Sequence, residues 1–213
     1  MKSYIWIGGI IVILIALMVF AVKGTGGVDI NPPLQLDAIH KLDNVQGNAN
    51  AKVVIIEYSD FQCPACRTYY LVMKELMVEF GGEVALVYRH FPLTEIHANS
   101  EFAARAAQAA GKQGKFWEMH DLLFEKQSEW SKEANVGPMF ESYAKLLGIS
   151  VEQFKIDWAS KEISDLVRAE RVHAIKSGLQ GTPTFFINGK KIENPSSVDA
   201  FRTIIRDTIK TKQ

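Results

Sequence analysis

The sequence predicts an α/β domain organised around two cysteines and preceded by one membrane-spanning segment. Three observations support this prediction. Cys63 and Cys66 are the only cysteines of the chain, and they lie between a strand-like run and a helix-like run. Residues 96–177 show the spacing of apolar residues that is typical of helices. Residues 4–22 form an uncharged apolar run at the N-terminus.

The N-terminal run is a candidate membrane anchor. As a helix that rises about 1.5 Å per residue, residues 4–22 match the thickness of a bilayer core. The apolar region of a cleaved signal peptide is usually shorter, about 7–15 residues, although residues 19–21 also fit a small-residue cleavage site. We expect residues 1–23 to be an uncleaved anchor in the lipid bilayer. The domain that follows then lies outside the cytoplasm on the cell membrane, where disulfides persist.

Residues 24–50 are predicted to be a tether to a domain at residues 51–213. Glycine and proline are frequent in this segment and disfavour long regular structure. A short strand or helical turn around residues 34–42 is compatible with the composition. The segment is too short to fold as a module of its own.

Composition limits the classes of function. Lys and Arg together number 24, as do Asp and Glu, so the formal net charge is zero and nucleic acid is not indicated as a partner. One Cys-x-x-Cys pair is too few for a disulfide scaffold, and scattered histidines do not complete a zinc site. The pair is therefore predicted to be redox-active, with zinc binding and a plain structural disulfide as less favoured alternatives. No metal or other cofactor is predicted.

The first half of the domain is predicted to be a strand–helix–strand unit. Residues 53–58 form a buried strand, residues 64–80 a helix, and residues 83–91 a second, parallel strand. Pro64 suits the first turn of the helix, where no amide hydrogen bond is lost. Cys63 should therefore lie at the helix N-terminus, where the helix dipole and the free amides favour a thiolate.

Two cysteines and one carboxylate are predicted to be catalytic. We expect Cys63 to be the sulfur that attacks or is attacked, and Cys66, one turn into the helix, to be the more buried resolving sulfur. Glu57 is unusual in so apolar a strand. If it points inward, desolvation raises its pKa and makes it a candidate proton acceptor, whereas at a solvated strand edge it has no such role.

The second half of the domain is predicted to begin with an inserted block of helices at about residues 96–177. Within this block, Ser150 is expected to cap a helix, and a break is expected near Ser160. Asn188 and Gly189 predict a two-residue hairpin. Residues 198–210 have the apolar face of a final helix.

Four motifs occur in order along the chain: SDFQCPAC at residues 59–66, YRHFPL at 88–93, QGKFWEMH at 113–120 and GTPTF at 181–185. Together they resemble the DsbA-like thiol:disulfide oxidoreductases, most closely the membrane-anchored branch of bacteria and archaea. The resemblance covers roughly residues 40–210. It implies a thioredoxin fold with an inserted helical subdomain.

The resemblance also implies roles for particular residues. It implies a cis peptide bond between Thr182 and Pro183 that faces the cysteines and helps to hold the substrate chain. It places Glu57 at the buried acidic position of the family, near Cys66. The residues predicted to bind substrate are Thr182, Pro183, Phe61, Pro64 and Ala65.

One departure from the family lies between the cysteines. The best-known strongly oxidising members carry Pro-His there, whereas this chain has Pro64 and Ala65. One hydrogen-bond donor to the thiolate is therefore missing. We expect the pair to be less oxidising as a result, by tens of millivolts on an order-of-magnitude conversion of one charge-assisted hydrogen bond.

The predicted function is that of a dithiol oxidase that introduces disulfides into exported proteins through Cys63 and Cys66. Its partners are predicted to be unfolded or reduced exported proteins and a membrane redox partner that resets the pair. One alternative is a disulfide reductase or isomerase of the same fold. Another is a peptide-binding or holdase module with an inert disulfide. The pKa of Cys63 separates the last alternative from the others, and the reduction potential separates oxidase from reductase.

Overall fold

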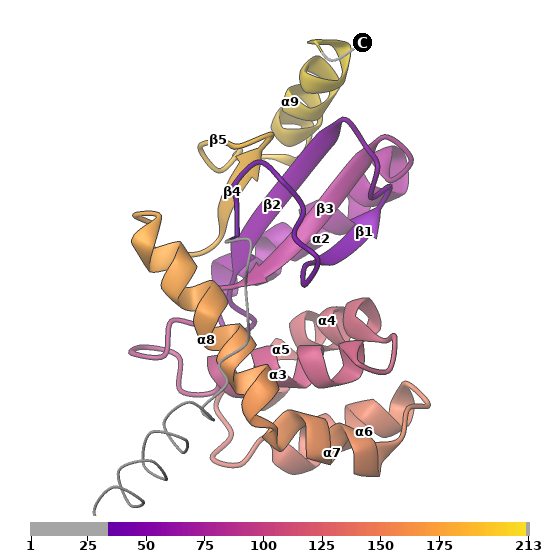
Figure 1. Cartoon of the computed structure of the whole chain (residues 1–213), viewed down its shortest axis with the longest axis vertical. Helices are drawn as coiled ribbons and strands as arrows, with labels where there is room; N and C mark the ends of the chain where they lie inside the picture. Colours follow the sequence, from indigo (N-terminus) through magenta and orange to yellow (C-terminus); the bar gives the residue numbers. More distant parts are fainter. Residues whose placement is uncertain (1–33, 212–213) are drawn as a thin grey trace, which may run out of the picture.

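The structure is a computed structural model, and it describes residues 34–211 (Figure 1). The predicted anchor at residues 4–22 and the part of the tether before residue 34 lie outside the described residues. Within residues 34–211, no helix is long and apolar enough to cross a membrane.

Within the described residues, a five-stranded sheet with the order β1-β3-β2-β4-β5 organises the fold. The strands are β1 (Asn44–Gly47), β2 (Val53–Ser59), β3 (Val84–His90), β4 (Thr184–Ile187) and β5 (Lys190–Lys191). Strands β2 and β3 are parallel, as the strand–helix–strand prediction requires, and the other neighbouring pairs are antiparallel. Asn188 and Gly189 join β4 to β5 with φ angles of 46° and 80°, which confirms the predicted hairpin.

Alternate residues of β2 face opposite sides of the sheet. Val53 and Ile55 pack against α2 (Pro64–Phe80) and α9 (Val198–Thr211). Ile56 and Tyr58 face the other side, toward residues 34–43 and the end of α8 (Lys161–Lys176). Because Glu57 follows Ile55 by two positions, its side chain lies on the α2 side of the sheet.

The predicted helical insertion is confirmed. Its other helices are α3 (Ser100–Gly111), α4 (Phe116–Glu125), α5 (Gln127–Trp130), α6 (Gly137–Leu146) and α7 (Val151–Ala159). The side chain of Ser150 accepts a hydrogen bond from the amide of Gln153, and Ser160 separates α7 from α8. Figure 1 shows the sheet in the upper part of the molecule, most of the insertion in the lower part and α8 running between them.

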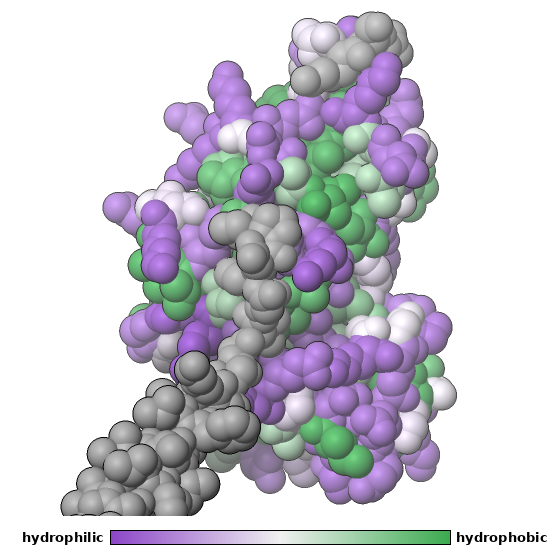
Figure 2. All heavy atoms as spheres, in the orientation of Figure 1, coloured by the Kyte–Doolittle hydropathy of each residue, from purple (hydrophilic) through white to green (hydrophobic). Residues whose placement is uncertain are grey.

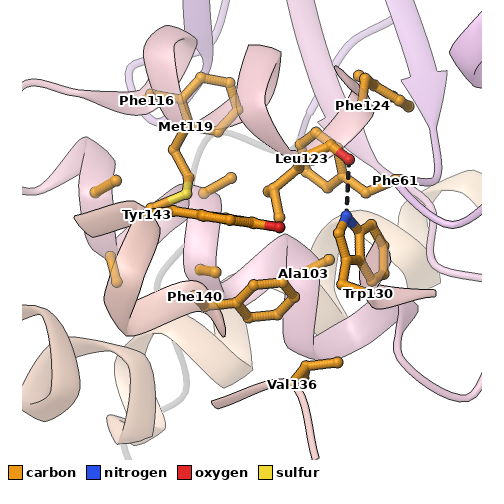
Figure 3. Close-up of a cluster of buried hydrophobic side chains, with 14 of the residues drawn as sticks. Phe61, Ala103, Phe116, Met119, Leu123, Phe124, Trp130, Val136, Phe140 and Tyr143 are labelled. Carbon is orange, nitrogen blue, oxygen red and sulfur yellow. Dashed lines mark hydrogen bonds between the residues drawn. The ribbon is translucent and has the colours of Figure 1, made fainter. Parts of the chain in front are cut away.

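An aromatic and aliphatic core joins the insertion to the cysteine loop (Figure 3). At its centre, the indole Nε1 of Trp130 donates to the carbonyl oxygen of Leu123 at 2.8 Å, and its ring packs at an angle on Phe140. Phe61, which precedes the cysteines, belongs to the same cluster. The loop that carries Cys63 is therefore held in place by its packing against the helical insertion.

Part of the predicted tether belongs to the sheet. Residues 44–47 lie within the range 24–50, yet they form β1 and pair with β3 along their length. The composition allowed a short strand or helical turn around residues 34–42, where the structure has bends and turns. The four-residue strand was difficult to predict because its stability comes from pairing with β3 and not from its own pattern.

A buried ion pair holds the segment before β1 in place. Arg89 of β3 contacts Asp43 at 2.8 Å, and both side chains are fully buried. The same guanidinium donates to the carbonyl oxygens of Gln35 and Ala38. Figure 2 shows that this side of the molecule is largely hydrophilic, with hydrophobic residues gathered over the sheet. Residues 34–43 cross the same side of the sheet and pack on its buried apolar residues. The segment therefore covers apolar surface of the sheet.

Candidate active site

The reactive sulfur lies where the sequence predicts. Cys63 is the N-cap residue of α2, Pro64 occupies the first turn, and no side chain caps the helix. The amides of that turn are therefore left for the sulfur. Cys63 is 7% exposed and Cys66 is fully buried, and both are free thiols.

The two thiols have opposite pKa shifts. The pKa of Cys63 is lowered from 9.0 to about 5, chiefly because the Cys66 thiol donates a hydrogen bond to the Cys63 thiolate. Burial is the main cause that raises the pKa of Cys66 well above its ordinary value, and its hydrogen bond to Cys63 acts in the same direction. At neutral pH, the pair therefore consists of a thiolate at Cys63 and a thiol at Cys66.

Glu57 points inward and is 3% exposed. Burial raises its pKa to about 7, and the nearby Ser59 hydroxyl opposes that shift. The Ser59 hydroxyl also lowers the pKa of Cys66, so the carboxyl group and the buried thiol lie around the same hydroxyl. The inward position that the prediction required is therefore observed, and the catalytic role of Glu57 stays a prediction.

Thr182 and Pro183 face the cysteines from the loop before β4. The peptide bond between them is cis, and the carbonyl oxygen of Thr182 lies 3.5 Å from the sulfur of Cys63. Both residues line an open groove of about 570 Å³. Asn194, which also lines the groove, donates from Nδ2 to the carbonyl oxygen of Pro183 at 2.8 Å and so holds the loop in place.

The remaining predicted substrate-binding residues divide into two groups. Pro64 and Ala65 are exposed beside Cys63, where a bound chain would pass. Phe61 is only 1% exposed and stacks on Tyr88 with ring centroids 5.0 Å apart. Its prediction as a substrate-contacting residue is therefore corrected: an aromatic ring between strand and helix is buried more favourably against the core than left at the surface.

Two amide side chains that were not predicted, those of Gln127 and Gln62, hold the cysteine loop. Gln127 donates from Nε2 to the carbonyl oxygens of Phe61 and Cys63, at 2.7 and 2.9 Å. The side-chain carbonyl of Gln62 accepts a hydrogen bond from the backbone N–H of Asn99 at 2.7 Å. Gln127 and Asn99 belong to the helical insertion, far along the chain from the cysteines. No local pattern marks them, because their roles depend on contacts between distant segments.

Thiol–disulfide exchange requires a stabilised thiolate and a second thiol that can close a disulfide with it. Cys63 and Cys66 meet both requirements. Among residues 34–211, no group of three or more histidine, cysteine or carboxylate side chains is arranged to hold a metal ion. Together with the strand order, the cysteine pair defines a thiol–disulfide oxidoreductase of the thioredoxin fold.

The sequence model of the family described as Thioredoxin matches residues 40–207, and the chain belongs to this family. Within it, the solved structures that resemble the chain place it among the DsbA-like thiol–disulfide oxidoreductases. Oxidised BdbD from Bacillus subtilis superposes with a TM-score of 0.70 and 26% identity, over 79% of this chain and 93% of that chain. Alpha-DsbA1 from Wolbachia pipientis has a TM-score of 0.74 at 20% identity, over 82% and 94%, a likeness of fold alone.

The curated relatives are longer proteins. "Na(+)/H(+) antiporter NhaA 3" of Salinispora tropica is 34% identical over 180 residues, which cover 84% of this chain and 26% of the relative. "Na(+)/H(+) antiporter NhaA 1" of Mycobacterium sp. (strain KMS) is 39% identical over 158 residues, which cover 72% and 24%. The chain thus spans about a quarter of these relatives. The similarity concerns one segment of each, and the antiporter name describes the whole polypeptide.

Proposed function

We propose that the protein is a dithiol oxidase that introduces disulfides into unfolded or reduced exported proteins. The observation that carries the proposal is the stabilised thiolate of Cys63. Whatever stabilises this thiolate stabilises the reduced pair relative to the disulfide. The disulfide between Cys63 and Cys66 is then a stronger oxidant.

The proposed reaction has two exchange steps. A substrate thiolate attacks the sulfur of Cys63 in the disulfide, and Cys66 leaves as a thiolate that receives a proton from Glu57. A second substrate thiolate then attacks the substrate sulfur in the mixed disulfide, and Cys63 leaves as a thiolate. The substrate has lost two electrons and gained a disulfide, and the cysteine pair has gained those two electrons.

The groove beside Pro183 supports a polypeptide substrate. It is open, it reaches the loop that faces Cys63, and its walls carry both charged and apolar residues, among them Lys191, Ile192 and Glu193. Such a surface suits an extended chain of varied sequence, since main-chain hydrogen bonds do not depend on the side chains of the substrate. A substrate joined to Cys63 would lie against Thr182 and Pro183.

The proposed setting is the extracytoplasmic side of the cell membrane. Residues 4–22 would anchor the domain there, and a membrane redox partner would accept two electrons from the reduced pair and restore the disulfide. The support is the apolar N-terminal run of the sequence together with a chemistry that needs an oxidising compartment.

The reduction potential of the cysteine pair against glutathione tests the proposal. We expect a value closer to that of DsbA, about −120 mV, than to that of thioredoxin, about −270 mV. A value near that of thioredoxin would overturn the oxidase assignment in favour of a reductase. The presence of Ala65 between the cysteines favours the reductase, because the alanine side chain cannot donate a hydrogen bond to the Cys63 thiolate. The Cys66→Ala variant, which cannot form the internal disulfide, is the control.

A further inference from the structure

A cavity of about 210 Å³ opens on the flank of α2 that faces α4 and the β1–β3 edge of the sheet. It shares no lining residue with the groove beside Pro183. The two lie on different flanks of α2: Tyr69 packs on Phe185 and bonds to the carbonyl oxygen of Pro195, whereas Tyr70 lines the cavity. A substrate chain in the groove would therefore leave the cavity open.

Glu57 is one of the residues that line the cavity. This side chain is almost completely buried, and its Oε1 has no hydrogen-bond partner in the protein. A buried carboxyl oxygen without a partner calls for water, and one buried water needs about 10–15 Å³ of such a volume. The cavity therefore has room for a chain of several waters that begins at Glu57.

The outer end of the cavity is polar and open to solvent. Lys74 of α2 contacts Asp121 of α4 at 3.1 Å, with side chains 49% and 36% exposed. The other carboxylate oxygen of Asp121 lies 3.0 Å from Nδ1 of His120, which also lines the cavity. The hydroxyl of Tyr70 accepts a hydrogen bond from Lys74 at 2.8 Å. Charged groups thus stand at the mouth, and the carboxyl group of Glu57 stands at the buried end.

The exchange chemistry needs such a connection. Cys66 is fully buried, and a substrate bound at Cys63 covers the side of the pair that faces the groove. Protons that Cys66 gains or loses must then travel by another way. Because its pKa is raised to about 7, Glu57 can hold or release a proton near neutral pH.

We propose that this cavity is the route by which protons pass between solvent and Glu57 while a substrate occupies the groove, with Asp121 and Lys74 as positioning residues at its mouth. The inference rests on the proposed use of Glu57 as the proton donor to Cys66. When a substrate thiolate displaces Cys66, the Glu57 acid gives its proton to the Cys66 sulfur. The carboxylate that remains takes up one proton from solvent through the cavity. Reoxidation of the pair sends one proton out by the same route.

The ionisable groups around Glu57 come from three elements. The strand neighbour from β4 is Phe185, which carries no charge. The groups are Cys66, Tyr70 and Lys74 on α2, Tyr88 on β3, and His120 and Asp121 on α4.

A proton route affects the rate of thiol–disulfide exchange but not the reduction potential of the cysteine pair. Blocking it should slow the step at Cys66 in both directions by the same factor, because the free energies of the oxidised and reduced states do not change. Removing the Glu57 carboxyl group, in contrast, changes both the rate and the equilibrium. This difference separates a path for protons from a merely structural cavity.

Two substitutions obstruct the cavity from different sides. Val78 lies on the rim and is 88% exposed, so Val78→Trp should lay an indole over the mouth without disturbing the core. Leu86 lines the inside, and Leu86→Phe fills part of the volume. The matched control is Leu71→Trp, which adds the same ring to an exposed position of α2 outside the cavity.

The test is the single-turnover rate of exchange between the oxidised full-length protein and a reduced cysteine peptide, followed by acid quench and thiol alkylation. It is measured from pH 5 to 8 in H₂O and D₂O. We expect both cavity variants to be slowed roughly three- to tenfold, less than the about 100-fold or more that a general acid can contribute. Their solvent isotope effect should rise, and their reduction potential should equal that of the wild type and of Leu71→Trp.

Three results would overturn the route. Wild-type rates in both cavity variants, combined with a slowed Glu57→Gln variant, would show that protons reach Glu57 by another way. A wild-type rate in Glu57→Gln would remove the donor on which the route depends. Equal slowing of Leu71→Trp would assign the effect to the surface of α2. None of these results depends on whether the potential favours oxidation, so the route and the oxidase proposal fail independently.

Discussion

The sulfur of Cys63 lies 3.5 Å from the carbonyl oxygen of Thr182, although 119 positions separate the two residues. This contact brings the N-terminus of α2 against the loop that precedes β4. The reactive sulfur and the groove beside Pro183 therefore form one continuous site.

The hydrogen bond between the two thiols makes Cys63 a nucleophile at neutral pH. In Cys66→Ala this donor is lost, so the pKa of Cys63 should rise from about 5 toward its ordinary value of 9.0. Cys66→Ser keeps a hydroxyl donor and should show a smaller rise. Thiolate absorbance in the ultraviolet, titrated in the reduced protein, measures both. Identical pKa values in the wild type and Cys66→Ala would contradict this origin of the thiolate.

Burial of Glu57 gives a pH dependence of stability. Its pKa is raised from 4.5 to about 7, so between these values the folded protein binds a proton that the unfolded chain has released. The wild type should lose stability relative to Glu57→Gln as the pH rises through this window, by at most roughly 3 kcal/mol. Below this pH window, residue 57 is neutral in both the wild type and Glu57→Gln, so the difference between their free energies of unfolding should be constant.

Urea unfolding of the reduced proteins between pH 4 and 8 measures this effect. The comparison of variant with wild type removes the contribution of Cys63, which titrates in the same range in both. Glu133→Gln, at an exposed position, is the control and should stay parallel to the wild type. A parallel curve for Glu57→Gln would rule out a strongly raised pKa.

Ala65 is expected to limit the oxidising power of the pair. It is exposed beside Cys63, and Ala65→His would place a donor within reach of the thiolate. One charge-assisted hydrogen bond is worth about 1.5–3 kcal/mol, which corresponds to about 30–60 mV for this two-electron couple. The reduction potential should become less negative by that amount, and the pKa of Cys63 should fall.

Ala65→Leu enlarges the same side chain without adding a donor. Equilibration with glutathione should give this control the potential of the wild type. A shift in Ala65→Leu as large as that in Ala65→His would assign the effect to bulk and not to hydrogen bonding.

The ion pair between Arg89 and Asp43 should be costly to break. Both side chains are fully buried, so Asp43→Asn leaves a guanidinium without its counter-charge in the interior. We expect a loss of about 3–5 kcal/mol in the free energy of unfolding. In the exposed pair of Lys112 and Glu162, Glu162→Gln should cost at most about 1 kcal/mol. Equal losses in the two variants would contradict a structural role for the segment before β1.

Features that depend on neighbours along the chain were predictable. Pro64 marks the start of α2, the side chain of Ser150 begins α7, and Asn188 with Gly189 turns the hairpin. Each of these signals acts within a few residues of the chain. They therefore place Cys63 at a helix N-terminus without knowledge of the rest of the fold. The thioredoxin fold itself followed from motifs that resemble a known family.

Other features were decided by contacts between distant segments. The inward position of Glu57 depends on α2 and α4 packing over β2, and the burial of Phe61 depends on the helical insertion. The bonds from Gln127 to the cysteine loop join residues more than 60 positions apart. The sequence by itself determined which residues carry the thiol chemistry. Only the tertiary structure decided what surrounds them, because burial and long-range hydrogen bonds arise when the chain folds on itself.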